Sequence, residues 1–422
     1  MNANPVDRPG PVVLCKYQQD LLTALLDRHA EVCLVLDSVD RLYESPDQAL
    51  LARCAQVYNI SSFDSLSELS AVAVELRSSW PAITRVFNQN ELSQFGAGYL
   101  QLLLGLADSP LHHVSHRDKR LMKQLVRDAG VRTAEFRSLP DATDPVAIAE
   151  VIKELAGPLI VKPAAGFGSN TTERVDDLST LGQVATSLTF DTSQRSRQLI
   201  VEEYVTGEEL CVDAIWSAGK ALTFVVHRYL RPRMTVLDNA LDGSVILRPE
   251  EHPELHQRLR DMHARINPAL GIKDGLSHLE VFQCPDGELV FSEIASRAGG
   301  GWIQYMIGAH HGHSTWSLSA EAALTGTVPP LKPACPHLGG INIRPKAPGV
   351  ITDLPTDDQL SSFPGLVSWR WYRPRQVGEQ ARLTGPSDWY LFLILGADTA
   401  ADVLELCIQA ARSFTIETEA VR

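Results

Sequence analysis

The sequence predicts a multidomain protein that combines α/β and α+β parts. The chain has 422 residues, more than one ordinary hydrophobic core accommodates. Its N-terminal part alternates short apolar runs with helical segments, which is typical of a parallel sheet, and its middle contains runs of alternating polarity, typical of antiparallel strands. Apolar residues make up 44% of the chain and charged residues 21%, the balance of a globular protein.

Charge and cysteine content argue against several classes of protein. Asp and Glu outnumber Lys and Arg by 51 to 38, a net charge of −13, so we expect no nucleic acid partner. The seven cysteines are scattered and form no CxxC pair, which favours reduced thiols over disulfides or a zinc site. No apolar run is long enough for a membrane span, and the first residues lack the apolar core of a signal peptide. We therefore expect a cytoplasmic protein without a membrane partner.

The N-terminal region predicts a small parallel sheet. Apolar runs at Pro11–Cys15, Glu31–Leu36 and Gln56–Ile60 are separated by helical segments, which is the pattern of β-α-β units. Glu91 follows at a junction between a strand and a helix, where α/β layers commonly contact their ligands. The alternative is that Glu91 only caps the next helix.

Two lysines lie where an anion is expected. Lys119 is in the first turn of an amphipathic helix, where a positive charge opposes the helix dipole, so it is either solvated or retained for an anion. Lys162 lies on the strand Leu159–Pro163, and the small-residue loop Ala164–Asn170 follows. A lysine followed by such a loop can bind phosphate through a point charge and backbone N–H groups, although no Walker sequence is present.

The stretch His278–Ala295 predicts a β-hairpin with two carboxylates on one face. With a loop of two or four residues, Glu280 faces Glu293, with Cβ atoms roughly 4.5–5.5 Å apart, a spacing that suits a shared Mg²⁺. A three-residue loop with a bulge at Gly287 would shift the parity by one and separate the two glutamates. A surface hairpin with solvated acids is the other alternative.

The segment after this hairpin is suited to an oxyanion. Arg297 lies four residues beyond Glu293, on the same face if the strand continues. Gly299–Gly301 then offers backbone N–H groups without side chains. A further strand is expected over Leu199–Glu203 and a helix over Pro253–Leu270. The last part of the chain predicts a compact α+β lobe with short strands at 341–344, 366–373 and 390–395 and a helix near 400–412.

Taken in order, Lys119, the Lys162 strand with its loop, the strand that ends in Glu202 and Glu203, and the hairpin resemble the ATP-grasp fold, and specifically its carboxylate–amine ligases. The resemblance is clearest over residues 116–326. It implies a Rossmann-like pre-ATP-grasp domain at 1–112, a lid subdomain at 113–205, a second ATP-grasp subdomain with the metal site at 206–330, and an α+β lobe at 331–422.

The resemblance also implies a role for each motif residue. Lys162 and Arg297 would be catalytic, Glu280 and Glu293 would bind Mg²⁺, with Mn²⁺ as an alternative ion, and Ala295 replaces an asparagine ligand of many relatives, which leaves the number of ions open. The ATP-binding residues would be Lys119, Lys162, Ser169, Glu202, Glu203, Val205, Glu209 and Arg228. The sequence EIASRAGGGW is similar to that of L-amino acid ligases and carnosine synthase, which implies the substrate-binding residues Glu91, His278, Arg297, Gly300, Gly301 and Trp302.

The activity implied is ATP-dependent formation of an amide or peptide bond between amino acids, through an acyl phosphate, with release of ADP and phosphate. The partners would be small amino acid or amine substrates, and a homodimer is left open. Two alternatives remain: a carboxylating or purine-pathway ATP-grasp enzyme, and a nucleotide-binding module without turnover. The sequence does not identify the carboxylate or the amine.

Overall fold

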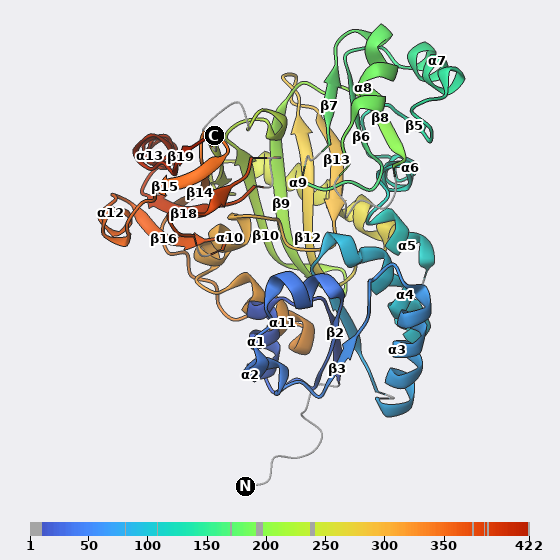
Figure 1. The fold of residues 1–422 in the computed structure, drawn as a ribbon, viewed down its shortest axis with the longest axis vertical. Coiled ribbons are helices and arrows are strands. Elements are labelled where there is room, and N and C mark those ends of the chain that lie inside the picture. Colours follow the sequence, from blue (N-terminus) through green and yellow to red (C-terminus); the bar gives the residue numbers. More distant parts are fainter. Residues whose placement is uncertain are drawn as a thin grey trace.

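The computed structural model describes residues 11–80, 82–107, 109–168, 171–190, 197–236, 241–373, 375–383, 385 and 388–420. Within these ranges the strands form four sheets. Figure 1 shows the N-terminal domain (blue) below the large central sheet, the lid subdomain (teal and green) at the upper right and the C-terminal lobe (orange and red) at the left. No helix in the described part of the chain has both the length and the apolar character of a membrane span.

The N-terminal sheet is parallel, as expected, and has four strands in the order β3-β2-β1-β4. Its strands are β1 (Val12–Cys15), β2 (Val32–Leu36), β3 (Gln56–Asn59) and β4 (Arg85–Asn88). Its helices are α1 (Gln19–Asp27), α2 (Gln48–Leu51), α3 (Leu66–Ser79), α4 (Gln94–Leu104) and α5 (Pro110–Ser115). The sequence did not predict β4, which has only four residues. β4 is an edge strand that pairs with the buried β1, so the chain leaves the sheet beside β1 just before Glu91.

The lid subdomain is an antiparallel sheet with the order β5-β8-β6-β7. Its strands are β5 (Phe136–Leu139), β6 (Leu159–Pro163), β7 (Glu173–Val175) and β8 (Leu199–Glu203), and α6 (Lys119–Asp128), α7 (Pro145–Glu154) and α8 (Leu181–Ser187) lie beside it. One face of β6 and β8 packs Leu159, Val161 and Val201 into the apolar core. Since side chains alternate along a strand, Lys162 and Glu202 point to the opposite face.

The central sheet has eight strands in the order β13-β12-β9-β10-β11-β14-β18-β16, and all neighbours are antiparallel. The strands are β9 (Glu208–Ser217), β10 (Lys220–Tyr229), β11 (Asp242–Leu247), β12 (Gly275–Gln283), β13 (Leu289–Ala295), β14 (His337–Ile343), β16 (Leu366–Trp371) and β18 (Leu391–Ala397). Pairing of β11 with β14 carries this sheet past residue 330 into the C-terminal lobe. One continuous sheet therefore supports both parts.

Smaller elements complete the two ends of this sheet. The helix α9 (Pro253–Leu270) packs on the central sheet with its residues Leu259, Met262 and Ile266, and has the bounds that the sequence predicts. The remaining elements are α10 (Ile303–His311), α11 (Thr315–Thr325), α12 (Asp357–Ser361), α13 (Ala400–Ser413) and the sheet of β15 (Gly349–Asp353), β17 (Gln380–Ala381) and β19 (Glu417–Glu419). The C-terminal lobe is thus α+β, as expected.

Candidate active site

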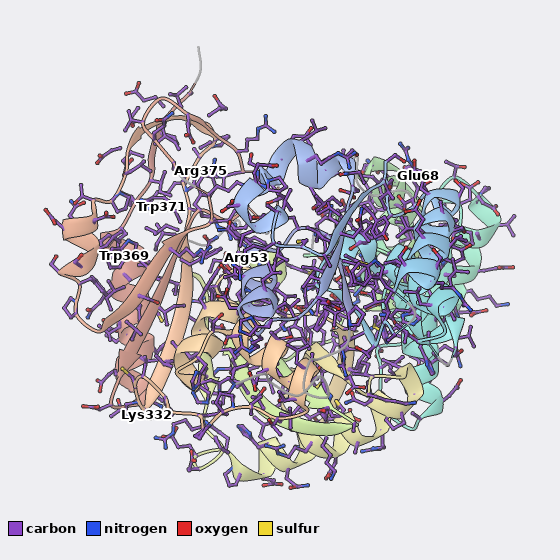
Figure 2. All side chains as sticks on the ribbon, turned by 90° about the horizontal axis from the view of Figure 1, so that it is seen from below. Arg53, Glu68, Lys332, Trp369, Trp371 and Arg375 are labelled. Carbon is purple, nitrogen blue, oxygen red and sulfur yellow. The ribbon has the colours of Figure 1, made fainter. Side chains whose placement is uncertain are left out.

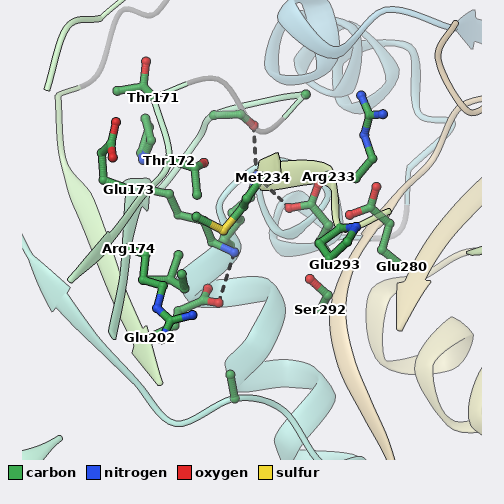
Figure 3. Close-up of a pocket in the computed structure, with 18 of the residues that line it drawn as sticks. Thr171, Thr172, Glu173, Arg174, Glu202, Arg233, Met234, Glu280, Ser292 and Glu293 are labelled. Atoms are coloured by element: carbon green, nitrogen blue, oxygen red, sulfur yellow. Dashed lines mark hydrogen bonds and ion pairs between the residues drawn. The ribbon is translucent and has the colours of Figure 1, made fainter. Parts of the chain in front are cut away.

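The hairpin of β12 and β13 brings the two expected carboxylates together. Glu280 is the direct partner of Glu293 in the antiparallel register, as the sequence predicts. Opposed side chains of an antiparallel pair leave the same face of the sheet. Figure 3 shows the two carboxylates side by side on adjacent strands, directed toward the same part of a cavity.

The loop has the three residues of the alternative considered above, yet the two glutamates are paired as in the first prediction. The Cys284 amide donates to the Glu288 carbonyl at 2.8 Å, so the loop holds three residues, and Gly287 has φ +85°. Such a loop alone would pair Glu280 with Ser292. The register shifts once more between Glu280 and Val281, because Ser292 forms a bulge in β13. The two irregularities cancel, and the glutamates face each other.

A cavity of about 1030 Å³ lies between the lid and the central sheet. It is lined from the lid by β6, the loop at 166–168 and the segment at 171–174, and from the central sheet by β12 and β13. Among the described residues, eight of those expected to bind ATP or metal line it: Lys119, Lys162, Glu202, Glu203, Val205, Glu209, Glu280 and Glu293. Ser169 lies outside the described residues.

Lys119 joins the hairpin of β12 and β13 to the lid. Its ammonium group lies 3.0 Å from Glu293 Oε2 and donates to the Gly166 carbonyl at 2.9 Å. Burial opposes ionisation of Glu293, but the charges of Lys119 and Lys162 outweigh it and hold the pKa of this carboxyl well below its usual range. Glu293 is therefore an ionised carboxylate with a lysine where a metal ion would also bind.

Lys162 and a lysine that the sequence analysis missed share a second carboxylate. Lys162 lies 3.0 Å from Glu202 Oε2, and the fully buried Lys123 lies 3.4 Å from the same atom. Burial lowers the pKa of Lys123 to about 8, against the raising effect of Glu202. Burial also acts on Lys162, yet Glu202 and Glu293 together raise its pKa. Lys123 is one helical turn after Lys119 on the same face of α6, and this i, i+4 spacing was the available signal.

The far end of the cavity holds Glu209. Its Oε2 atom accepts a hydrogen bond from the Arg233 backbone N–H at 3.0 Å, and burial raises the pKa of Glu209 to about 7. Arg233 lines the cavity, while the expected phosphate contact Arg228 does not and instead pairs with Glu208 at 3.1 Å. Arg233 was missed because its segment has no strand or long helix in the sequence pattern.

Arg297 is held by a carboxylate of the N-terminal domain. Its Nε atom donates to Glu91 Oε2 at 2.6 Å, and Arg117 donates to Glu91 Oε1 at 3.1 Å. Burial opposes ionisation of Glu91, but Arg297 and Arg117 lower its pKa. Both oxygens of Glu91 thus bind guanidinium groups, whereas the resemblance implied that Glu91 contacts a substrate.

His278 lies on β12 and belongs to a buried cluster of polar side chains. Asp213 Oδ2 accepts from His278 Nδ1 at 3.0 Å and from His227 Nε2 at 2.8 Å, and Asp213 Oδ1 accepts from the Gly299 amide at 3.1 Å. His278 Nε2 lies 3.4 Å from Glu280 Oε1. Burial lowers the pKa of His278, but Asp213 more than offsets this and raises it well above the usual value. His278 therefore orients Glu280 and the glycine segment; it does not line the cavity.

Gly300, Gly301 and Trp302 lie apart from the large cavity. A Cβ atom at Gly300 would be 2.8 Å from Trp389 Cη2, and Gly301 has φ +63° and lies against the same ring. Trp302 is 1% exposed, packs in the core with Ile303 and donates from Nε1 to Ser244 Oγ at 2.9 Å. Trp302 is a core side chain, and its indole has no surface for a substrate.

The residues of the hairpin fit a divalent metal ion. Two carboxylates converge, and oxygen ligands are those that Mg²⁺ prefers. Glu293 is ionised and 27% exposed on its side chain, so it is accessible from the cavity. Ala295 offers no side-chain oxygen, which leaves water and phosphate oxygens to fill the other positions.

Comparisons with known proteins agree with this fold. A family model described as an ATP-grasp domain matches residues 155–305. The chain has the ATP-grasp fold, with an N-terminal parallel sheet, a lid and an antiparallel central sheet.

Two curated relatives and one solved structure are informative. An L-arginine-specific L-amino acid ligase of Bacillus subtilis is 26% identical over 276 residues, which cover 64% of this chain and 64% of that protein. D-alanine–D-alanine ligase A of Escherichia coli K12 is 27% identical over 213 residues, which cover 48% of this chain and 57% of that ligase. The crystal structure of an L-amino acid ligase from Bacillus licheniformis has a TM-score of 0.75 at 15% identity and is matched over 98% of this chain and 99% of that chain. The curated matches thus span less than two thirds of each relative.

Proposed function

We propose that this protein is an ATP-dependent ligase that joins a carboxylate to an amine, with amino acids as substrates, and that it releases ADP and phosphate. The observation that carries the proposal is the facing pair Glu280 and Glu293, with Lys119 and Lys162 over it and Arg297 beyond it. Two curated relatives are named as ligases of amino acids, which supports the same class.

In this proposal the cavity binds ATP with its phosphates toward the hairpin. Glu280 and Glu293 would hold Mg²⁺, which would offset negative charge on the phosphate groups. Lys119 and Lys162 approach the phosphate oxygens as point charges. In the protein alone, Lys119 pairs with Glu293 and Lys162 with Glu202. A bound phosphate would replace the carboxylate as the partner of each lysine.

A carboxylate is a poor acyl donor, and phosphorylation by ATP converts it into an acyl phosphate that an amine can attack. Negative charge grows on the acyl oxygen during the attack. Arg297 is placed to stabilise it, because the planar guanidinium has its Nε engaged by Glu91 and Nη1 by the Ala298 carbonyl, which fixes its direction. Glu91 acts as a positioning residue for Arg297 in this proposal.

The loop after β6 would cover the reacting groups. The Gly166 carbonyl accepts from Lys119 at 2.9 Å and from Arg117 Nη1 at 2.9 Å, so this loop is already drawn over the lysine that faces the hairpin. Exclusion of water matters chemically, since an exposed acyl phosphate would hydrolyse before the amine arrives.

The test is nucleotide and product analysis after incubation with ATP, Mg²⁺ and pairs of amino acids. We expect ADP, phosphate and a dipeptide, identified by mass. AMP and pyrophosphate would instead mean adenylation and would overturn the acyl phosphate step. A requirement for bicarbonate or formate would indicate a carboxylating or purine-pathway enzyme, and no ADP with any pair would favour a binding module.

A further inference from the structure

A second cavity lies in the C-terminal lobe and has no role in the function proposed above. Its volume is about 440 Å³, within the range of roughly 300–1,000 Å³ common for small-molecule sites. Its lining comes from the segments that follow β16 and precede β18: Tyr372, Arg373, Arg375, Gln380, Arg382, Asp388, Trp389 and Tyr390. Figure 2 shows Arg375 near Trp371 in this lobe.

The lining carries an excess of positive charge. Three arginines stand against one carboxylate, Asp388, in a protein with a net charge of −13. Arg373 has a partner in the N-terminal domain, Glu44, at 3.3 Å, and Arg375 reaches Glu379 only at 3.7 Å. For Arg382, no carboxylate among the described residues lies within ion-pair distance. Arg373 and Arg382 are exposed and Arg375 is half-buried, so an anion that enters this cavity is attracted by all three guanidinium groups.

Aromatic side chains hold these arginines in place. The Tyr390 hydroxyl accepts from the Arg382 amide at 2.8 Å and donates to the Arg382 carbonyl at 2.7 Å, which fixes the backbone at this residue. Arg375 lies over the Tyr390 ring, 4.7 Å from its centroid. The Arg375 Nε atom is buried, and no acceptor among the described residues lies within hydrogen-bond distance of it. This N–H is therefore a donor without an acceptor.

The two cavities share a wall. Asp388 lines both of them. Trp389 lines the smaller cavity and packs on Gly300 and Gly301, which follow Arg297 along the chain. Glycine is needed at both contacts, because a side chain at 300 would overlap the indole and Gly301 has a positive φ. The segment that follows Arg297 thus contacts Trp389 in the wall of the smaller cavity.

We propose that this cavity binds an anionic group of one substrate, so that the ligase joins an amino acid that carries a second, non-reacting carboxylate or phosphate. This inference rests on the function proposed above. The guanidinium groups of Arg375 and Arg382 bind the anion through charge-assisted hydrogen bonds, and Trp389 and Tyr372 cover the apolar part of the substrate. The reacting group then extends past Asp388 toward Arg297.

The test compares acidic and neutral amino acids of similar size in the phosphate-release reaction. Glutamate and aspartate represent the carboxylate, O-phosphoserine the phosphate, and glutamine, asparagine and serine are the neutral partners. We expect an acidic compound to be preferred and its KM to rise about tenfold or more in Arg382→Gln and in Arg375→Gln, with kcat little changed. Arg412→Gln, an exposed change on α13 outside both cavities, is the matched control and should leave KM unaltered.

Direct binding separates this inference from the function. Calorimetry with glutarate and with inorganic phosphate, in the presence of ADP and Mg²⁺, should give a signal that Arg382→Gln weakens and Arg412→Gln retains. That result supports the anion site even if no amino acid pair is turned over. Preference for neutral amino acids, with KM and anion binding unchanged in both arginine variants, would overturn the inference and leave the ligase function standing.

Discussion

The two cavities differ in how their cations are paired. In the large cavity Lys119 and Lys162 each lie 3.0 Å from a carboxylate of the protein. In the cavity of the C-terminal lobe, Arg375 has only a distant carboxylate partner and, among the described residues, Arg382 has none. An anion that enters the large cavity must therefore exchange partners with Glu293 and Glu202, whereas one that enters the smaller cavity adds to charges already available. A Mg²⁺ ion held by Glu280 and Glu293, as proposed above, would compensate the carboxylate that the lysine leaves.

The largest expected effect comes from removing the charge of Glu293. Glu293→Gln keeps the size of the side chain but loses the carboxylate that would hold Mg²⁺ and that pairs with Lys119. We expect phosphate release to fall by at least about a thousandfold, with loss of Mg²⁺-dependent ATP binding. Glu288→Gln, on the same hairpin with its carboxylate at the surface, is the control. Parent-like turnover in Glu293→Gln would mean that the metal site lies elsewhere.

The next effect tests the guanidinium group of Arg297. Arg297→Lys retains the charge and loses the planar fork that Glu91 and the Ala298 carbonyl orient. We expect turnover slower by roughly 10²–10³, with nearly normal binding of Mg²⁺-ATP. Phosphate release gives the rate and calorimetry gives the binding.

Arg258→Lys serves as its control. Arg258 lies on α9 and donates to the Gly287 carbonyl at the turn of the hairpin. Equal losses of ATP binding and of rate in Arg297→Lys would place the guanidinium on ground-state ATP rather than on the acyl group.

A smaller effect concerns pH and lies outside both cavities. His263 is buried between α9 and the central sheet against Trp216, and burial lowers its pKa to about 4, in spite of the hydrogen bond with Asn267. In the unfolded chain this imidazole binds a proton below about pH 6.5, so its contribution to stability is complete above that pH and is lost as pH falls toward 4.

Between pH 7 and pH 5 the free energy of unfolding should fall by about 2 kcal/mol because of His263 alone. Urea unfolding of the parent and of His263→Gln at both pH values measures this fall. In the variant, the free energy of unfolding should fall by about 2 kcal/mol less than in the parent. His116 acts in the same direction, since burial also lowers its pKa to about 4. An identical pH dependence of the two proteins would contradict the assignment.

The smallest expected effect tests the connection between the two cavities. Gly300→Ala places a Cβ atom 2.8 Å from Trp389 Cη2, so the indole, which lines the smaller cavity, has to shift. We expect KM for an acidic substrate to rise roughly fivefold, with little change for ATP. Steady-state kinetics with each substrate varied in turn checks this. An equal rise in the KM for ATP would show that the change disturbs the hairpin instead.

Local patterns in the sequence were sufficient for the hairpin and the lid strands, since alternation along a strand fixes which side chains share a face. These patterns placed Glu280 opposite Glu293 and Lys162 on a strand. They also predicted the full length of α9. The pairing nevertheless depended on a bulge at Ser292, which no local signal marked. The position of a single bulged residue depends on the side chains that pack around the strand.

The parts of the site that depend on distant contacts were not predictable. Lys123 was missed because its burial depends on the lid sheet. Trp302 was expected in a substrate pocket, although it packs in a core built from the strands β10, β11, β14 and β18 and the helix α10. Glu91 was expected at a ligand, yet two arginines from elsewhere in the chain occupy its oxygens. Pairing between residues far apart in sequence decides these outcomes.

The bulge at Ser292 has a mechanical consequence. A bulged residue has backbone groups outside the ladder, and the Ser292 carbonyl accepts from Lys123 Nζ at 2.7 Å. The same ammonium group reaches Glu202 on β8 of the lid. Lys123 therefore joins α6, the lid and the edge of the central sheet at one point. Any displacement of β8 relative to β13 would have to break one of these two contacts, so the ammonium group ties the lid to the central sheet one helical turn after Lys119.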